Sequence, residues 1–137
     1  MRYSPPEGPD PAGRICYWNQ IMLNANAIDH APLGQIVPAG EQIGPPRTAR
    51  AFAIVHIAIF DAVNAIVGGY ESYTRISPSR GKASVDAAIA KAAHDTLAAL
   101  YPSQEEIFDE LLAEDLERLS LHIPPATPPS ERFCSRS

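Results

Sequence analysis

The stretch AFAIVHIAIFDAVNA, residues 51–65, is apolar on almost every side and is the most informative part of the sequence. It belongs to a run, residues 47–67, that contains neither proline nor glycine and that Pro45 and Pro46 precede. Proline suits the first turn of a helix, where a missing N–H group costs nothing, so this pattern predicts one long helix. Because a helix that is apolar all round is normally buried on several sides, we expect other helices to surround it.

The same run is almost long enough to span a membrane. Residues 49–67 number nineteen, and a bilayer is crossed by roughly 20 residues. However, Asp61 near the middle would cost about 2.5 to 3.5 kcal/mol on insertion, and the run is rich in alanine rather than leucine. The sequence therefore favours a buried helix over a membrane span.

Apolar residues at helical spacing predict three further helices. One covers residues 15–28, and another covers residues 84–100 with Ser84 as its N-cap. The last begins near Ser103, which forms a capping-box pattern with Glu106. No segment alternates as a strand would, so the expected fold class is all-α, an incomplete bundle of about four helices.

Fourteen prolines are concentrated at the two ends and in one loop. Proline removes backbone donors and breaks regular structure, so residues 1–13 and residues 122–137 are expected to be disordered Pro-rich ends. The helical region is expected to cover residues 14–121, with a loop at residues 31–44.

Charge and cysteine content exclude several classes of protein. The formal charge is −5, and the nine arginines and two lysines are scattered, so no basic stripe could bind nucleic acid. Seven of the sixteen acidic residues fall between residues 105 and 117 and are interpreted as the solvated face of one helix. Cys16 and Cys134 lie too far apart in sequence to indicate a disulfide framework or a zinc site. The first residues contain no apolar run typical of a secretory signal, so a cytoplasmic location is expected.

The polar residues His56, Asp61 and Asn64 interrupt the apolar helix and must be satisfied if they are buried. Asp61 and Asn64 share one face of the helix, whereas His56 and Asp61 diverge by roughly 140°. A metal site on one helix would need spacings of three or four residues. We interpret these residues as a structural polar network bonded to neighbouring helices or loops, with direct catalysis or metal binding as the less favoured alternative.

Arg47 and Arg50 lie in the first turn of the same predicted helix, where their charge opposes the helix dipole. An acidic or carbonyl group is expected to face them. The functional alternative is contact with an anion, which a helix N-terminus would assist.

Four segments of the chain resemble the N-terminal region of bacterial vanadium-dependent haloperoxidases, which are related to the type 2 phosphatidic acid phosphatases. The similarity runs from about residue 16 to residue 119. It is carried by the segments CYWNQIMLNANAIDHAPL from residue 16, PPRTARAFAIVHIAIFDAVNAI from residue 45, GGYESY from residue 68 and DAAIAKAAHDTLAALYP from residue 86.

The resemblance implies an all-helical bundle whose later half holds vanadate or phosphate. Such an oxyanion needs a lysine and arginines, N–H groups from a Ser-Gly turn, and two histidines. This sequence contains no Ser-Gly-His, and after Ser79 and Arg80 the next histidine, His94, is too distant for the family's last motif. No catalytic, cofactor-binding or metal residue is therefore assigned, although vanadate is implied for the full-length family.

We thus expect a truncated or frame-shifted helical scaffold that is inactive alone. Its expected partner is the missing C-terminal catalytic half or another copy of the chain, which should make it a dimer or a poorly soluble monomer. Two alternatives stay open: an independent helical interaction and oligomerisation module, and a haloperoxidase or acid phosphatase that is active only in an assembly.

Overall fold

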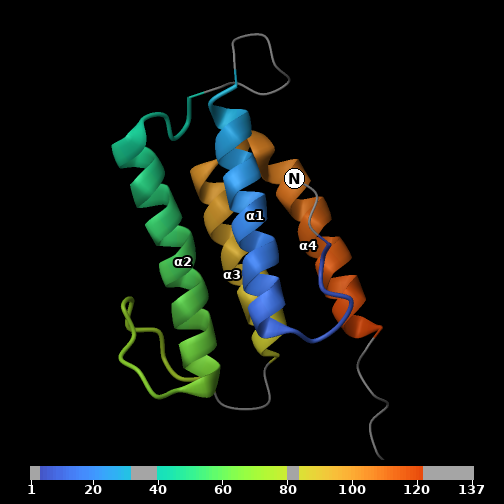
Figure 1. Cartoon of the computed structure of the whole chain (residues 1–137). Coiled ribbons are helices and arrows are strands. Elements are labelled where there is room, and N and C mark those ends of the chain that lie inside the picture. The colour runs from blue at the N-terminus through green and yellow to red at the C-terminus, as the bar shows by residue number, and fades with distance from the viewer. Residues whose placement is uncertain (1–3, 32–39, 80–83, 122–137) are drawn as a thin grey trace, which may run out of the picture.

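The described part of the protein contains four α-helices and no strand, in agreement with the predicted all-α class (Figure 1). The computed structural model describes residues 4–31, 40–79 and 84–121. The helices are α1 (Pro11–Asp29), α2 (Pro45–Val67), α3 (Val85–Leu100) and α4 (Glu105–Ser120), and the short 3-10 turn η1 (Pro102–Gln104) precedes the last of them. The predicted disorder of residues 122–137, which include Cys134, lies outside the described residues.

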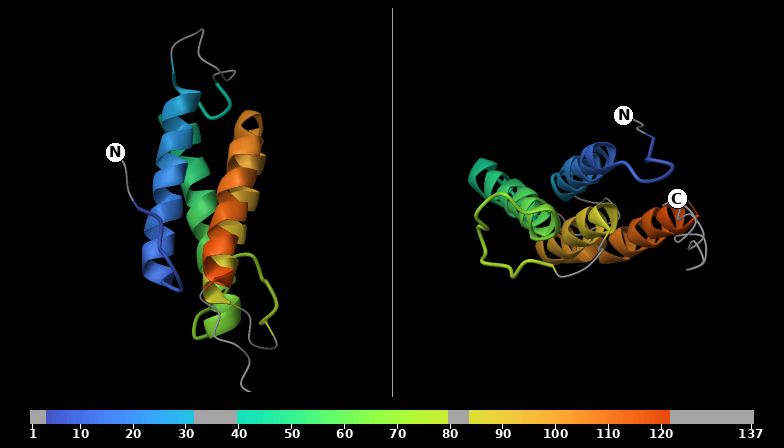
Figure 2. Two further views of the ribbon diagram at one scale, coloured as in Figure 1. Left: turned by 90° about the vertical axis from the view of Figure 1, so that its right-hand side faces the viewer. Right: turned by 90° about the horizontal axis from the view of Figure 1, so that it is seen from below.

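Helix α3 is the centre of the bundle. It packs against α1, α2 and α4, and the view from below shows α2, α3 and α4 in a row with α1 across one side (Figure 2). The small residues Ala90 and Ala93 are fully buried in α3 and let the neighbouring helices approach closely. The core also contains two large aromatic side chains that are completely buried: Trp18 of α1 and Tyr101, the C-cap residue of α3.

Helix α1 begins earlier than its apolar pattern indicated. Its first residue is Pro11, and the carboxylate of Asp10 caps it by accepting a hydrogen bond from the Gly13 N–H. The prediction that disorder extends to residue 13 is therefore wrong for residues 11–13. The physical reason is local: proline is favoured at the first helical position, and aspartate is a strong N-cap.

Helix α2 begins at the two prolines and ends at Gly68, as predicted. Gly68 has a φ of 74°, a backbone conformation that favours glycine, and its N–H donates to the Asn64 carbonyl. The buried apolar residues of α2, which are Ala51, Val55 and Ile59, share one face, so the expectation that other helices surround α2 is wrong for the described bundle. Asp61 is buried on another side, under the loop that follows the helix. By length and composition alone α2 could cross a membrane, a test that core helices of soluble proteins also pass.

Ser84 caps α3 by accepting a hydrogen bond from the Ala87 N–H, as predicted. The capping box predicted for α4 is wrong, because Ser103 lies in η1 and its hydroxyl donates to the carboxylate of Glu41, which lies shortly before α2. The apolar stripe of α4 is also only partly covered: Phe108 is buried, but Ile107 is 45% exposed.

Candidate functional site

A buried ion network joins α1, α3 and α4. The guanidinium of Arg14 donates to both carboxylate oxygens of Asp115, at 2.8 and 3.0 Å, and to Asp86 on α3. The Trp18 indole N–H donates to the same Asp115 carboxylate at 2.9 Å, and Arg118 adds a further hydrogen bond. Arg14 and Asp115 are completely buried, so three helices are held together by charges that water does not reach.

Asp115 corrects the interpretation of the acidic run as one solvated face. Six of the seven acids between residues 105 and 117 are exposed, but Asp115 is fully buried. A signal for this was present: Asp115 follows Phe108 by seven residues and precedes Leu119 by four, so it lies on the apolar side of α4. A carboxylate in that position needs a buried cation, and Arg14 supplies it.

The network determines the ionisation of Asp115. Burial acts to raise the pKa of Asp115, but the hydrogen bonds from Arg14 and Trp18 and the positive charge of Arg14 outweigh it, and the pKa lies below its ordinary value. Burial acts to lower the pKa of Arg14, but the hydrogen bonds and negative charges of Asp115 and Asp86 outweigh it. The pKa of Arg14 therefore lies above its ordinary value. Both groups are therefore charged in the folded protein.

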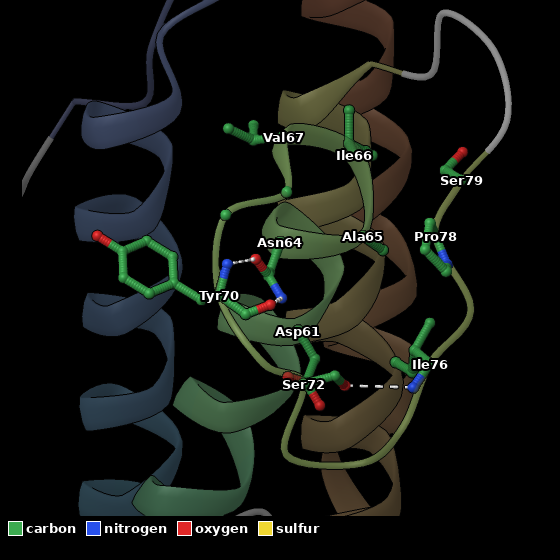
Figure 3. A pocket seen from close by; sticks show the side chains of 12 residues that line it. Asp61, Asn64, Ala65, Ile66, Val67, Tyr70, Ser72, Ile76, Pro78 and Ser79 are labelled. Carbon is green, nitrogen blue, oxygen red and sulfur yellow. Dashed lines mark hydrogen bonds between the residues drawn. The ribbon is translucent and has the colours of Figure 1, made fainter.

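The C-terminal half of α2 holds the loop that follows it (Figure 3). The Asp61 carboxylate accepts hydrogen bonds from the backbone N–H groups of Tyr73 and Thr74, at 2.9 and 2.8 Å, and from the Thr74 hydroxyl. The Asn64 side chain bonds both to the carbonyl and to the N–H of Tyr70. Two of the three residues of the predicted polar network thus bind one loop and leave a pocket of about 380 Å3 beside it.

His56 does not join this pair. Its Nε2 atom lies 2.8 Å from the Asn19 Oδ1 on α1, so it links two helices instead. The divergence expected from the five-residue spacing explains this separation. His56, Asp61 and Asn64 are each hydrogen-bonded, but they form two separate sets of contacts.

The Asp61 contacts predict a local effect of mutation. In Asp61→Asn the side-chain NH2 cannot accept the bonds that the lost oxygen accepted, so the amides of Tyr73 and Thr74 should exchange hydrogen about tenfold faster or more. Glu71→Gln makes the same chemical change at an exposed position of the same loop and should leave these amides unchanged. Hydrogen exchange followed by NMR measures both variants, and equal protection in wild type and Asp61→Asn would contradict the assignment.

Acid should weaken the fold through Asp61 and Asp115. The hydrogen bond from the Thr74 hydroxyl, with those from two backbone N–H groups, outweighs burial and lowers the pKa of Asp61. Because both folded-state pKa values are depressed, the stability they contribute is complete above the ordinary carboxyl pKa of about 3.9 and is lost as pH falls through the folded values. Urea midpoints measured from pH 7 downward should therefore fall below about pH 4. Asp61→Asn should flatten that decline while Glu71→Gln should not, and equal declines in both would contradict this origin.

Arg47 and Arg50 are exposed on the first two turns of α2. Within the described parts of the chain, neither forms an ion pair, so the acidic partner expected for them is not found there. Gly44 caps this helix without a side-chain hydrogen bond. The anion contact considered for the two arginines stays a prediction.

Asp29, at the end of α1, binds a segment of backbone that the pattern of its own helix could not predict. Its buried carboxylate accepts hydrogen bonds from three successive backbone N–H groups, those of Gly40, Glu41 and Gln42, at 3.1, 2.8 and 2.8 Å. Such a run of N–H groups forms a concave binding site for an anionic group. Asp29 therefore holds residues 40–42, which lie shortly before α2, against the end of α1.

His94 on α3 is largely buried, although it lies between the charged residues Lys91 and Asp95 in the sequence. Its side chain is only 12% exposed, and its two ring nitrogens lie 2.7 Å from Asp95 and 2.6 Å from Asp109 of α4. From the sequence, His94, Lys91 and Asp95 are expected on the solvated outer edge of this helix. That prediction is wrong for His94, because α4 packs over it, and is confirmed for the exposed pair Lys91 and Asp95.

The described residues do not fit an oxyanion such as vanadate. The buried cation Arg14 is occupied by two carboxylates. Arg47 and Arg50 are exposed, and the one histidine bonded at the start of their helix, His30, already accepts a hydrogen bond from the Gly44 N–H. In the ranges 4–31, 40–79 and 84–121, no group of three histidine, cysteine, aspartate or glutamate residues could hold a metal ion. The polar groups that the fold brings together are instead bonded to one another and fasten helices and loops.

Comparison with known proteins gives two matches. The family described as the vanadium chloroperoxidase N-terminal domain matches residues 11–120. A vanadium chloroperoxidase from Curvularia inaequalis is 27% identical over 104 residues, which cover 76% of this chain and 16% of that relative. The chain thus spans about one sixth of that relative's length. No solved structure is significantly similar to the chain.

Proposed function

Because the chain belongs to the vanadium chloroperoxidase N-terminal domain family, we propose that it is the helical scaffold portion of a vanadium-dependent haloperoxidase-like protein and is inactive alone. The observation that carries this proposal is the extent of the family match, residues 11–120, which includes all four described helices. The chain would contribute a preassembled bundle, and a separate part would bind vanadate.

The chemistry of the chain supports a scaffold rather than a complete active site. Vanadate, when bound, would supply the group that activates peroxide, and its negative oxygens need several free cationic and N–H donors. Arg14 cannot serve, because Asp115 and Asp86 already accept its N–H groups. The N–H groups of residues 40–42 are likewise occupied by Asp29. The donors of Arg14 and of residues 40–42 are therefore already used to stabilise the fold, whereas Arg47 and Arg50 stay available to an anion.

An activity assay separates the scaffold from an enzyme. The purified chain with vanadate, peroxide and bromide should oxidise bromide no faster than the same mixture without protein. A heat-denatured sample of the chain is the matched control, because it keeps any trace metal of the preparation. Turnover that depends on the folded chain would contradict the scaffold proposal and favour an enzyme that is active in an assembly.

The coding sequence offers a second test. Translation of the downstream nucleotides in the other frames should contain a Ser-Gly-His motif or a Ser-Arg pair followed by a histidine. Absence of both patterns, together with absence of a co-expressed chain that carries them, would remove the proposed vanadate-binding partner.

An independent helical interaction module is the second candidate, and one observation favours it. The four helices share a core of their own, in which Trp18, Tyr101 and Phe108 are at most 1% exposed. A chain with such a core can fold without a partner. Cooperative melting of the isolated monomer without binding of an oxyanion, and without any downstream catalytic motif, would favour this module over the scaffold.

A further inference from the structure

An apolar groove runs between the C-terminal half of α1 and the first turns of α4. Ile21 and Ile28 line it from α1, and Ile107 and Leu111 line it from α4. Its volume is about 200 Å3. We call it the α1–α4 groove, and Ile107, 45% exposed, is its most open apolar side chain.

Hydrogen bonds join the two helices at and beside the groove: at the start of α4, the buried Gln104 side chain, which lines the groove, donates to the Ala25 carbonyl of α1. Toward the start of α1, the bonds from Arg14 and Trp18 to Asp115 close the seam between the two helices. Ile21 and Ile28 are seven residues apart, so at 1.5 Å per residue the groove is about 10 Å long. That length matches about two turns of an incoming helix.

The two rims of the groove differ in charge. Glu110 and Glu114 follow Ile107 by three and seven residues, so they lie on the groove side of α4, and both are exposed. On the opposite rim, the two charged residues of α1, Arg14 and Asp29, are both buried, and the exposed positions of this helix are uncharged. An apolar floor thus lies between an acidic rim and a neutral rim.

We propose that the α1–α4 groove binds an amphipathic helix of a partner protein that carries apolar residues on one face and lysine or arginine along one flank. The apolar ridge of the partner lies on Ile107 and Leu111, and its basic flank faces Glu110 and Glu114. The neutral α1 rim leaves the other flank without a charge requirement. This binding does not depend on the vanadate chemistry of the family, so it can fail while the scaffold proposal stands.

The charge pattern determines the probe. A synthetic 14-residue helix with leucines at positions i, i+3, i+4 and i+7 and lysines on one flank is compared with the same helix bearing glutamates on that flank. Fluorescence anisotropy with the full chain should show saturable binding of the lysine peptide. The glutamate peptide should bind at least about tenfold more weakly, and salt should reduce the difference.

Two variants locate the binding. Ile107→Ser removes an apolar contact from an exposed position and should weaken the lysine peptide about tenfold. Glu110→Lys combined with Glu114→Lys should reverse the preference toward the glutamate peptide. Glu7→Lys combined with Glu71→Lys changes the net charge equally at exposed positions outside the groove and should preserve the preference. Circular dichroism of each variant shows whether it is folded.

Three results would overturn the proposal. The first is equal affinity of folded wild type and folded Ile107→Ser for the lysine peptide. The second is self-association of the wild type in analytical ultracentrifugation that Ile107→Ser abolishes, because a second copy would then occupy the groove. The third is loss of peptide preference in the outer control pair, because the attraction would then arise from net charge alone.

Discussion

Asp115→Asn is expected to destabilise the chain by about 3 to 5 kcal/mol, the range observed when one partner of a buried ion pair is removed. The guanidinium of Arg14 would keep Asp86 but would lose one of its two bonds to residue 115 and the opposite charge there, while staying out of water, because the Asn NH2 group cannot accept. The Trp18 N–H and the Arg118 guanidinium also donate to the Asp115 carboxylate, and they would compete for the one oxygen that asparagine keeps. Urea denaturation measures the free energy of unfolding.

The control for this variant is Glu110→Gln, the same loss of charge at an exposed position of α4, which should change stability by less than about 0.5 kcal/mol. If Asp115→Asn does not fold, Arg14→Lys keeps the charge but not the planar pair of donors and gives an intermediate loss. Equal stability of Asp115→Asn and Glu110→Gln would contradict the network as the link between α1 and α4.

Trp18→Ala should cost a similar amount, about 3 to 5 kcal/mol, for a different reason. Trp18 is completely buried between α1 and its neighbours, so its removal leaves a cavity and deprives Asp115 of a donor. Leu23→Ala on the same helix removes a side chain that is 40% exposed and should cost less than about 1 kcal/mol.

Trp18→Phe separates the two contributions of the indole. It fills most of the space but lacks the N–H, so its loss should fall between those of wild type and Trp18→Ala. Thermal and urea unfolding measure the stability of the wild type, Trp18→Ala and Trp18→Phe. A Trp18→Ala loss no larger than that of Leu23→Ala would show that Trp18 does not belong to the core.

Local signals explain why α2 and α3 could be predicted closely. Pro45 and Pro46 begin α2, Gly68 ends it, and Ser84 caps α3, and each acts within a few residues of the boundary that it determines. Because each signal lies next to the boundary that it determines, it can be recognised from the sequence alone. The all-α class followed from them.

The contacts that hold the site together were harder to predict because they join distant residues. Arg14 and Asp115 are separated by 101 positions, and the Ser103 hydroxyl finds Glu41 rather than its own helix. Asp61 binds N–H groups twelve and thirteen residues further on, which the geometry of one helix could not indicate. For the buried ion network, the sequence signal was the position of Asp115 on the apolar side of α4. The many exposed acids around it led to its interpretation as part of a solvated face.

The partly covered face of α2 bears on the expected partner. Phe60 is 36% exposed and lies against the rings of Tyr70 and Tyr73 at centroid distances of 6.0 and 5.6 Å. The described bundle therefore buries α2 on one side and leaves an aromatic group on another. The proposed scaffold role accounts for an apolar helix of this kind, since a further helical part would cover the remaining surface.

Binding of vanadate to the isolated chain tests the central claim most directly. In a 51V NMR titration at neutral pH, the orthovanadate signal should keep its linewidth and position when the folded chain is added in excess, because Arg14 and the N–H groups of residues 40–42 are already bonded within the fold and Arg47 and Arg50 alone do not surround an oxyanion. Saturable broadening that disappears in the folded variant with Arg47→Ala and Arg50→Ala would show an oxyanion site on this chain and would contradict the account.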